Sequence, residues 1–264
     1  MNYLVFQLQA SLSSWGEPAV GEYRGTAEHP TQSALVGLLG AALGLLRENE
    51  SAHAALRDDY GFAVALISSG SLLRDYHTVQ VPTRLALTGR PHATRRHELA
   101  VPKTKTHLKT ILSTRDYRQN AASLVAVQAR DSAAPVHALA ELASALRQPK
   151  FTLYLGRKAC APGAPLWPQV VEAESAQKAF DAYATLFETA RRTAAGKYGP
   201  LPLEAMGPVT RIAFDDHIHA GVPHDLSTRR KDRLIRRKGW QFGDRNEHIA
   251  LLGDPLAVKF ISEA

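Results

Sequence analysis

Cysteine is almost absent from this sequence, since the 264 residues contain only Cys160. A single cysteine excludes an internal disulfide and any zinc site that needs several cysteines, and this usage is typical of a protein in a reducing compartment. We therefore expect a cytoplasmic protein. Cys160 itself is interpreted as a packing residue, because a lone cysteine is more often a small buried side chain than a reactive nucleophile.

Long apolar runs are lacking as well. The longest, residues 34–46, has 13 residues and includes three glycines, whereas a helix that spans a membrane needs about 20 apolar residues. We interpret it as a buried helix with Thr31 or Ser33 as its N-cap, and we expect no membrane association. The chain opens with a strand-like alternation over residues 3–10 rather than with a charged segment and an apolar core, so no signal peptide is predicted.

Motifs of catalysis and nucleotide binding are missing too. No Gly-x-Ser-x-Gly sequence is present, which weighs against a Ser-His-Asp hydrolase with a nucleophile elbow. The spacing of Gly37, Gly40 and Gly44 matches neither nucleotide-binding fingerprint. We interpret these glycines as small residues at the place where a helix packs on a sheet.

The best metal candidate is the run Asp215-Asp216-His217-Ile218-His219. His217 and His219 would share one face of a strand and present two imidazoles beside carboxylates. Histidines in polar loops are commoner than metal ligands, and no further ligand can be identified in the sequence. We therefore predict no metal and no cofactor.

Positive charge is abundant, and most of it lies in one segment. The formal net charge is +7, and residues 84–118 contain nine Lys or Arg against only Glu98 and Asp116, which accounts for the whole excess. A solvated basic loop would leave this self-repulsion without a counter-charge, so the segment favours an anionic partner such as a nucleic acid. A second cluster, residues 228–238, has seven cations and one acid, but nearby acids bring the C-terminal part close to balance; this cluster would contact RNA or a partner subunit.

Aromatic and histidine side chains flank the basic segment. Cations bind phosphates and flat side chains stack on unpaired bases, so this mixture predicts a surface for single-stranded RNA. The flanking residues are Tyr76, His77, His107, Arg115, Tyr117 and Arg118. Metal-independent RNA cleavage would need only one base, one acid and one cation, which Tyr76, His77, Lys103, Lys105 and His107 could supply. The residue types alone leave holding and cutting both open.

The periodicity predicts an α+β protein whose first part follows the order β-α-β-β-α-β. The predicted strands cover residues 3–10, 62–67, 72–81, 123–129 and 151–155, and the predicted helices cover residues 31–46 and 135–147. This order, interrupted by an arm, is the split β-α-β arrangement of the ferredoxin-like (RRM-like) class, which many RNA-binding modules use. Residues 1–160 are therefore predicted to form a ferredoxin-like palm with a basic insertion at about residues 80–118. Residues 161–264 are predicted as a smaller C-terminal extension with one Ala-rich helix and short strands.

Four sequence blocks, in order along the chain, resemble a known family. They are Tyr3-Leu4-Val5-Phe6-Gln7-Leu8 running into Ser13-Ser14-Trp15-Gly16; Pro30-Thr31-Gln32-Ser33-Ala34-Leu35-Val36-Gly37-Leu38-Leu39-Gly40; Arg74-Asp75-Tyr76-His77-Thr78-Val79; and Tyr154-Leu155-Gly156-Arg157-Lys158-Ala159-Cys160. Together they are similar to the type I-E members of CRISPR-associated protein family 5, which are subunits of the Cascade surveillance complex. The resemblance covers most of the chain and is less clear beyond about residue 200.

The resemblance implies a palm with an inserted β-hairpin thumb that binds the 5′ handle of the CRISPR RNA. It also implies packing against the backbone subunit and the large subunit of Cascade, with target DNA engaged only indirectly. In type I-E relatives a different subunit cuts the precursor RNA, whereas in type I-C the family 5 protein is itself the endoribonuclease. The resemblance therefore implies a non-catalytic RNA-binding subunit, with a metal-independent endoribonuclease as the alternative and a protein adaptor as a third hypothesis.

The predicted RNA contacts combine the flanking residues with positions that match the family blocks. Arg115-Asp116-Tyr117 is similar to the arginine-acid-tyrosine stretch that follows the thumb, and Gln32 stands where an arginine is often seen. No catalytic residue is predicted. The predicted RNA-binding residues are Trp15, Arg24, Thr31, Gln32, Ser33, Tyr76, His77, Lys103, Lys105, His107, Lys109, Arg115, Tyr117, Arg157 and Lys158.

Overall fold

The computed structural model describes residues 1–16, 19, 21–101, 104, 106–130, 134–198 and 206–253. The strands are β1 (Asn2–Ser13), β2 (Tyr23–Arg24), β3 (Tyr60–Ser68), β4 (Ser71–Pro82), β5 (Leu108–Ala129), β6 (Gln169–Glu172), β7 (Arg211–Phe214), β8 (Leu226–Arg236) and β9 (Gln241–Leu251). The helices are α1 (Gln32–Leu43), α2 (Glu50–Asp58), α3 (Arg84–Leu87), α4 (Arg95–Leu99), α5 (Leu139–Arg147) and α6 (Ala176–Tyr198). Within the described ranges, no helix combines the length and apolarity that a bilayer span requires.

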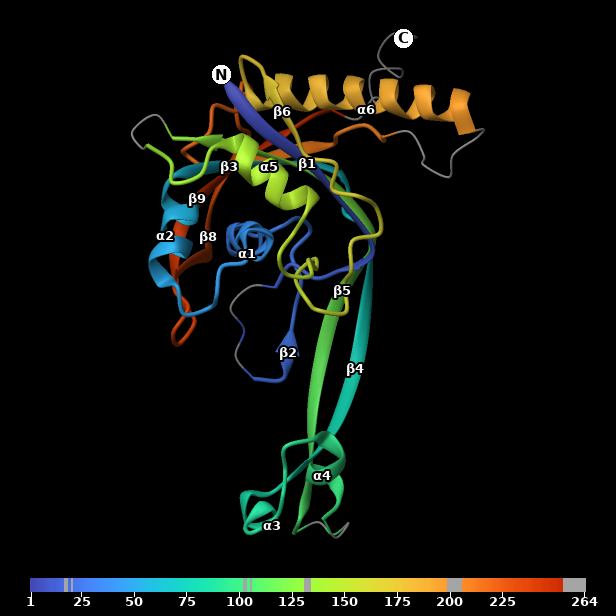
Figure 1. Ribbon diagram of the computed structural model, residues 1–264, viewed down its shortest axis with the longest axis vertical. Helices are drawn as coiled ribbons and strands as arrows, with labels where there is room; N and C mark the ends of the chain where they lie inside the picture. The colour runs from blue at the N-terminus through green and yellow to red at the C-terminus, as the bar shows by residue number, and fades with distance from the viewer. Residues whose placement is uncertain are drawn as a thin grey trace.

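One mixed sheet organises the whole molecule (Figure 1). Its main path runs β6-β1-β5-β3-β7-β9-β8, while β2 and β4 both pair with β5. All pairs along the main path are antiparallel, as at Leu4 opposite Val127 and Val64 opposite Val125. The predicted combination of helices with a largely antiparallel sheet is therefore present. Strand β5 pairs with four other strands, β1, β2, β3 and β4.

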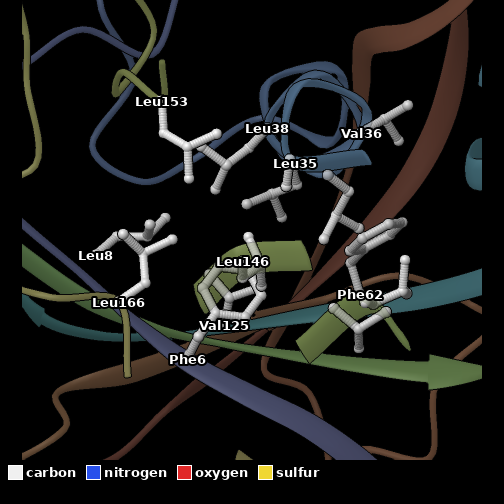
Figure 2. Packing of buried hydrophobic residues seen from close by; sticks show 14 of the residues in the cluster. Phe6, Leu8, Leu35, Val36, Leu38, Phe62, Val125, Leu146, Leu153 and Leu166 are labelled. Atoms are coloured by element: carbon white, nitrogen blue, oxygen red, sulfur yellow. The ribbon is translucent and has the colours of Figure 1, made fainter. Parts of the chain in front are cut away.

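Both faces of the central strands are buried. Leu4 and Phe6 of β1 point into a core that α1 and α5 cover, and Figure 2 shows Leu35 and Leu38 of α1 above Phe6 in this core. Tyr3 and Val5, which alternate with them along the strand, belong to a second core beneath α6. This arrangement follows from the two-residue period of a strand, because successive side chains point to opposite faces.

Helix α1 begins where its sequence predicts, but it ends at Leu43 and not at residue 46. The Thr31 hydroxyl caps the N-terminus by accepting a hydrogen bond from the N–H of Ala34 at 3.3 Å, and Gly44 ends the helix with a left-handed φ of 77°. The packing role expected for the glycines needs correction, however. At Gly40 an added Cβ would lie 2.8 Å from the ring of His53 in α2, so this glycine permits a close approach of two helices rather than of helix and sheet.

A long two-stranded arm projects from the sheet, away from α6 (Figure 1). Strand β4 pairs with the first half of β5 from Ser71 opposite Gln119 to Pro82 opposite Leu108, and the short helices α3 and α4 lie between the two strands. We call residues 71–119 the thumb hairpin. It begins at Ser71 rather than at about residue 80, because β5 is one continuous strand whose apolar second half pairs in the core while its polar first half extends outward.

The fourth strand of the β-α-β-β-α-β order was predicted in the wrong place. Residues 151–155 form no strand; β6 at Gln169–Glu172 pairs with β1 instead. The N–H groups of Lys150 and Phe151 donate to the last carbonyls of α1, and Leu153 and Leu155 are buried in the first core. Their alternation therefore reflects burial against α1 and not strand pairing.

The C-terminal part does not form a unit of its own. Strand β7 pairs with β3, and the β8–β9 hairpin continues the same sheet through the β7–β9 pair. Figure 1 shows β8 and β9 beside α1 and α2. The expected extension from residue 161 therefore contributes strands to the same sheet, and its β8–β9 hairpin packs beside α1. Local periodicity did not indicate this pairing, because the strands are short.

Candidate nucleic-acid interface

Asp116 joins the thumb hairpin to the rest of the protein. This buried carboxylate accepts hydrogen bonds from Nε and Nη2 of Arg74, at 2.9 and 3.1 Å, and from the hydroxyl of Tyr23 at 2.5 Å. The hydrogen bond from Arg74 lowers the pKa of Asp116, and the hydrogen bond to Asp116 raises the pKa of Tyr23. Strands β2, β4 and β5 are thus tied together by one side chain.

Arg157 connects the same place to the segment that follows α5. Its Nη1 donates to the carbonyl of Asp116 at 3.2 Å, its Nη2 donates to the carbonyl of Arg24 at 3.1 Å, and its guanidinium lies 4.5 Å from the ring centroid of Tyr117. The hydroxyl of Ser14 donates to the same Asp116 carbonyl at 3.0 Å. Residues from all the family blocks except the helical one therefore converge here, and we call Ser14, Tyr23, Arg74, Asp116, Tyr117 and Arg157 the thumb junction.

Gly156 brings Arg157 into this position. Its φ of 89° is left-handed, and a Cβ at this position would lie 1.7 Å from the carbonyl oxygen of Ser14. The adjacent carbonyl of Leu155 accepts a hydrogen bond from the N–H of Ser14 at 3.1 Å. Only glycine allows the two backbones to approach so closely, which is a physical reason for glycine in this block.

Beside the junction, a groove of about 290 Å³ runs between α1, residues 154–157 and the tip of the β8–β9 hairpin. We call it the α1 groove. Small residues of α1, such as Ala34, Gly37 and Ala41, line one side. The other lining residues are Ser14, Gly16, Thr31, Ser33, Leu38, Tyr154, Gly156, Arg157, Leu234, Arg237, Trp240 and Phe242. Three of the four family blocks therefore face one cavity.

Cations line the groove without a matching number of acids. The half-buried guanidinium of Arg237 has a pKa below its ordinary value, mainly because of burial and also because of Arg47. Among the described residues, no carboxylate forms a salt bridge with Arg237, and its buried Nε has no hydrogen-bond partner. Glu50 is close, but its two oxygens accept the backbone N–H groups of Arg237 and Lys238 at 3.0 and 2.8 Å. Arg237 thus has no salt-bridge partner among the described residues, although the nearby Glu50 carboxylate partly offsets its charge through space.

Flat side chains complete the groove. Trp240 is 53% exposed, and Tyr154 is 38% exposed. The ring of Phe242 lies nearly parallel to that of Trp240, with an interplanar angle of 12° and centroids 6.5 Å apart. The guanidinium of Arg47 lies 5.4 Å from the Trp240 centroid. Exposed aromatic rings beside cations can stack on bases while the cations bind phosphates.

Several predicted RNA-binding residues lie around α1. Trp15 is buried and packs in the first core, whereas Thr31 and Ser33 line the α1 groove. The N–H of Gln32 donates to Asp232 of β8 at 3.0 Å. A protein carboxylate therefore accepts the backbone N–H of Gln32, one of the predicted RNA-binding residues.

The predicted residues of the thumb hairpin divide between its two faces. Directly opposed residues share a face, so His77, Lys109, Arg115 and Tyr117 lie on one side and Tyr76 on the other. Arg24 and Lys158 are exposed near the junction. Lys103 and Lys105 lie outside the described residues. Arg115, Tyr117 and Arg157 are thus brought close to one another, whereas Tyr76 is separated from them.

Among the residues considered for RNA cleavage, the three that the structure describes, Tyr76, His77 and His107, do not converge. Tyr76 and His77 are neighbours on β4 and point to opposite faces. His107 lies six residues from Ser113, the partner of His77, which corresponds to about 20 Å along an extended chain. Tyr76, His77 and His107 therefore cannot act on one phosphate in this conformation.

The metal candidate and Cys160 are explained by packing. Asp215 is buried and accepts the N–H groups of Phe62 and His217 at 3.0 and 2.9 Å, while burial raises its pKa. In the part of the chain that the structure describes, no group of three or more His, Cys, Asp or Glu side chains is placed to hold a metal ion. Cys160 is buried in the first core, and burial raises the pKa of its thiol, so its interpretation as a packing residue is confirmed.

The sequence analysis missed the aromatic half of the groove. The second basic cluster was taken to end at Lys238, two residues before Trp240. Its cations are partly structural, since Arg230 pairs with Glu247 at 3.0 Å and Arg233 pairs with Asp58 at 2.7 Å. The available signal was that three cations are followed closely by two aromatic residues in Arg236-Arg237-Lys238-Gly239-Trp240-Gln241-Phe242. Without the fold, nothing in that run indicates that it faces α1.

This mixed fold, a large antiparallel sheet with a projecting hairpin, is shared with solved structures. A structure titled "CRISPR RNA-guided surveillance complex" contains a chain with a TM-score of 0.57 and 20% identity, covering 94% of this chain and 89% of that one. A structure titled "Crystal structure of Cas protein" has a TM-score of 0.56 and 23% identity, covering 95% and 94%. At these identities the likeness concerns the fold alone.

Sequence comparison identifies the family. The model of the family described as CRISPR-associated protein (Cas_Cas5) matches residues 3–245. The CRISPR system Cascade subunit CasD of Escherichia coli (strain K12) is 34% identical over 186 residues, which is 67% of this chain and 75% of that protein. The chain therefore belongs to CRISPR-associated protein family 5, in its type I-E group, as the four sequence blocks predicted.

Proposed function

We propose that this protein is a non-catalytic RNA-binding subunit of a Cascade complex that holds the 5′ handle of the CRISPR RNA. The observation that carries the proposal is the α1 groove, where three family blocks meet the exposed ring of Trp240 and the guanidinium of Arg237, whose buried Nε has no hydrogen-bond partner among the described residues. Its relative CasD is named as a Cascade subunit. A groove of this kind suits single-stranded RNA, which presents phosphates and unpaired bases together.

The thumb hairpin is proposed as the second part of this interface. His77, Lys109 and Arg115 share one face of it, and the junction keeps that face in a constant relation to the groove. A bound strand would pass from the thumb face toward α1. The order β6-β1-β5-β3 with antiparallel neighbours supports a ferredoxin-like palm beneath it.

The exposed apolar side chains of the thumb hairpin suit contacts with other subunits. Leu72 and Ile111 are 51% and 52% exposed, and Leu85 between the strands is 82% exposed. Leu72 and Ile111 lie on opposite faces of the hairpin, so each face offers an exposed apolar side chain to a protein partner. We assign these contacts to the backbone and large subunits of Cascade. Target DNA would be recognised by pairing with the guide RNA and not by this chain directly.

The test is a binding experiment with labelled repeat RNA at two salt concentrations in the presence of a chelator. The protein should retain the RNA intact, and affinity should fall as salt rises because phosphate contacts release counterions. Replacing Lys109 and Arg115 together by Gln should weaken binding and reduce the slope of log affinity against log salt by about 1.4, since each phosphate contact on a single strand contributes about 0.7.

Arg192→Gln on α6 is the matched control, since this exposed arginine lies on the other side of the sheet. Its affinity and salt dependence should equal those of the parent protein. A discrete RNA product ending in a 2′,3′-cyclic phosphate would show cleavage and would favour the endoribonuclease alternative over the holding role. Equal losses of RNA affinity in the thumb variant and the control would show that the thumb face does not contact the RNA.

A further inference from the structure

Trp240 is the most exposed of the three tryptophans, all of which are described. Trp15 is 4% exposed and Trp167 is partly buried, whereas Trp240 is 53% exposed. Its φ of 51° places it in the left-handed region, directly after Gly239 at φ 80°. A bulky residue with positive φ is strained, and a half-exposed indole contributes little to the core. The positive φ values belong to the tight turn that the hydrogen bond from the Trp240 N–H to the Arg237 carbonyl closes at 3.1 Å, but such a turn does not require an exposed indole.

The surroundings hold Trp240 in one orientation. Glu50 accepts the N–H groups of Arg237 and Lys238 at the start of the turn, at 3.0 and 2.8 Å. The guanidinium of Arg47, four residues after the end of α1, lies 5.4 Å from the indole centroid, and the ring of Phe242 in β9 lies nearly parallel to the indole. The remaining surface of the ring faces the α1 groove, which Trp240 lines. The turn is therefore preorganised rather than loose, which reduces the entropy lost when a ligand binds.

Arg237 supplies the charge beside this ring. Its Nη2 would lie 3.8 Å from a Cβ at Gly37, so the guanidinium rests on α1 where the helix has no side chain. Arg47 lowers the pKa of Arg237, and Glu50, whose oxygens accept backbone N–H groups, raises it by less. A bound phosphate would relieve the repulsion between the two arginines and give the buried Nε an acceptor.

We propose that the turn of the β8–β9 hairpin, Arg237 to Phe242, binds one nucleotide of single-stranded RNA, with its base on Trp240 and its phosphate on Arg237. The proposal rests on the proposed function, because it places part of the held RNA at this end of the α1 groove. Charge complementarity favours a nucleotide over a peptide: an acidic side chain could meet Arg237, but the adjacent flat ring matches the base that every nucleotide carries beside its phosphate.

Tryptophan fluorescence tests the stacking directly. Adding repeat RNA should quench the emission of the parent protein, because Trp240 is the exposed tryptophan, and Trp240→Phe should abolish most of that quenching. Trp240→Ala should weaken RNA affinity about tenfold, whereas Trp240→Phe should retain most of it because a flat ring remains. Thermal unfolding of both variants verifies that they fold, as expected for a surface residue.

Arg237→Gln and Arg236→Gln form a matched pair for the phosphate. Both remove one charge from adjacent positions, but Arg237 lines the groove and Arg236 does not. Only Arg237→Gln should reduce the slope of log affinity against log salt, by about 0.7 for one single-stranded contact.

Three results would overturn the proposal, and the third of them would overturn the proposed function as well. If RNA does not quench the emission of the parent protein and Trp240→Ala keeps its RNA affinity, the turn does not bind RNA. The protein could still be an RNA-binding subunit in that case. Normal RNA affinity with impaired assembly of the purified complex would assign Trp240 to a protein partner. Failure of the parent protein to bind repeat RNA at low salt would overturn the proposed function and this inference together.

Discussion

Gly156→Ala should lower the melting temperature of the isolated protein by about 6–12 °C, corresponding to a loss of about 3 kcal/mol for a domain of this size. The new methyl group would meet the Ser14 carbonyl at a position 1.7 Å away, and the residue would keep a φ of 89°. A left-handed non-glycine residue costs about 1–2 kcal/mol, and overpacking against a backbone adds about 1–3 kcal/mol. Differential scanning calorimetry measures the change.

Two other glycines provide controls for this substitution. Gly196 lies in α6 with nothing within 4 Å of an added Cβ, so Gly196→Ala should leave stability unchanged or raise it by up to about 1 kcal/mol. Gly89 combines a φ of 71° with open space, so Gly89→Ala isolates the backbone cost without the clash. A Gly156→Ala protein as stable as the Gly89→Ala protein would contradict the close contact with Ser14.

Asp116→Asn should destabilise the protein by about 2 kcal/mol at neutral pH, because hydrogen bonds between charged groups contribute about 1.5–3 kcal/mol each and the amide can replace only part of them. The variant loses the charge that two nitrogens of Arg74 bind and the acceptor for Tyr23. Urea unfolding at pH 7 measures the loss. We also expect weaker RNA binding, since Tyr23 of β2 would lose the carboxylate that links it to the thumb hairpin.

The same substitution has a defined pH dependence. Arg74 holds the pKa of Asp116 below its ordinary value, so the folded protein binds this proton more weakly than the unfolded chain does. The stabilisation is therefore complete above the ordinary carboxyl pKa and is lost as the pH falls through that value and then through the folded-state pKa. The difference in unfolding free energy between parent and Asp116→Asn should shrink over this acidic range.

Asp244→Asn is the control for charge removal, since Asp244 pairs with Arg229 at 3.3 Å between side chains that are 47% and 77% exposed. An exposed pair of this kind contributes less than about 1 kcal/mol. Its loss should therefore be small at pH 7 and nearly independent of pH. An equal effect of the two substitutions would contradict the role of Asp116 as the carboxylate that joins the thumb hairpin to the palm.

The parts of the fold that local sequence predicted are those with local causes. The alternation of β1 and the cap of α1 at Thr31 depend on neighbours within a few residues. The fourth strand was misplaced because Leu153 and Leu155 alternate for a non-local reason, their burial beside the end of α1. Periodicity records which side chains are buried, but it does not state what buries them.

The candidate site shows the same division more sharply. The family blocks predicted that Arg157 and Tyr117 matter, but not that the guanidinium of one would lie over the ring of the other. Trp240 is more than 80 residues from Arg157 in the sequence and shares a groove with it. No spacing rule relates such residues, because their proximity depends on how β8 and β9 extend the sheet around α1.

The sequence by itself determined the α+β class, the family, the absence of a disulfide framework and the concentration of positive charge in one arm, since composition and contiguous motifs carry these properties. Only the tertiary structure decided which cations remain uncompensated and which aromatic rings face them. Glu247 and Asp58 pair with Arg230 and Arg233 of the C-terminal cluster across 17 and 175 residues of sequence, whereas Arg237 forms no salt bridge among the described residues. Charge compensation depends on distances in space, and those distances exist only once the chain has folded.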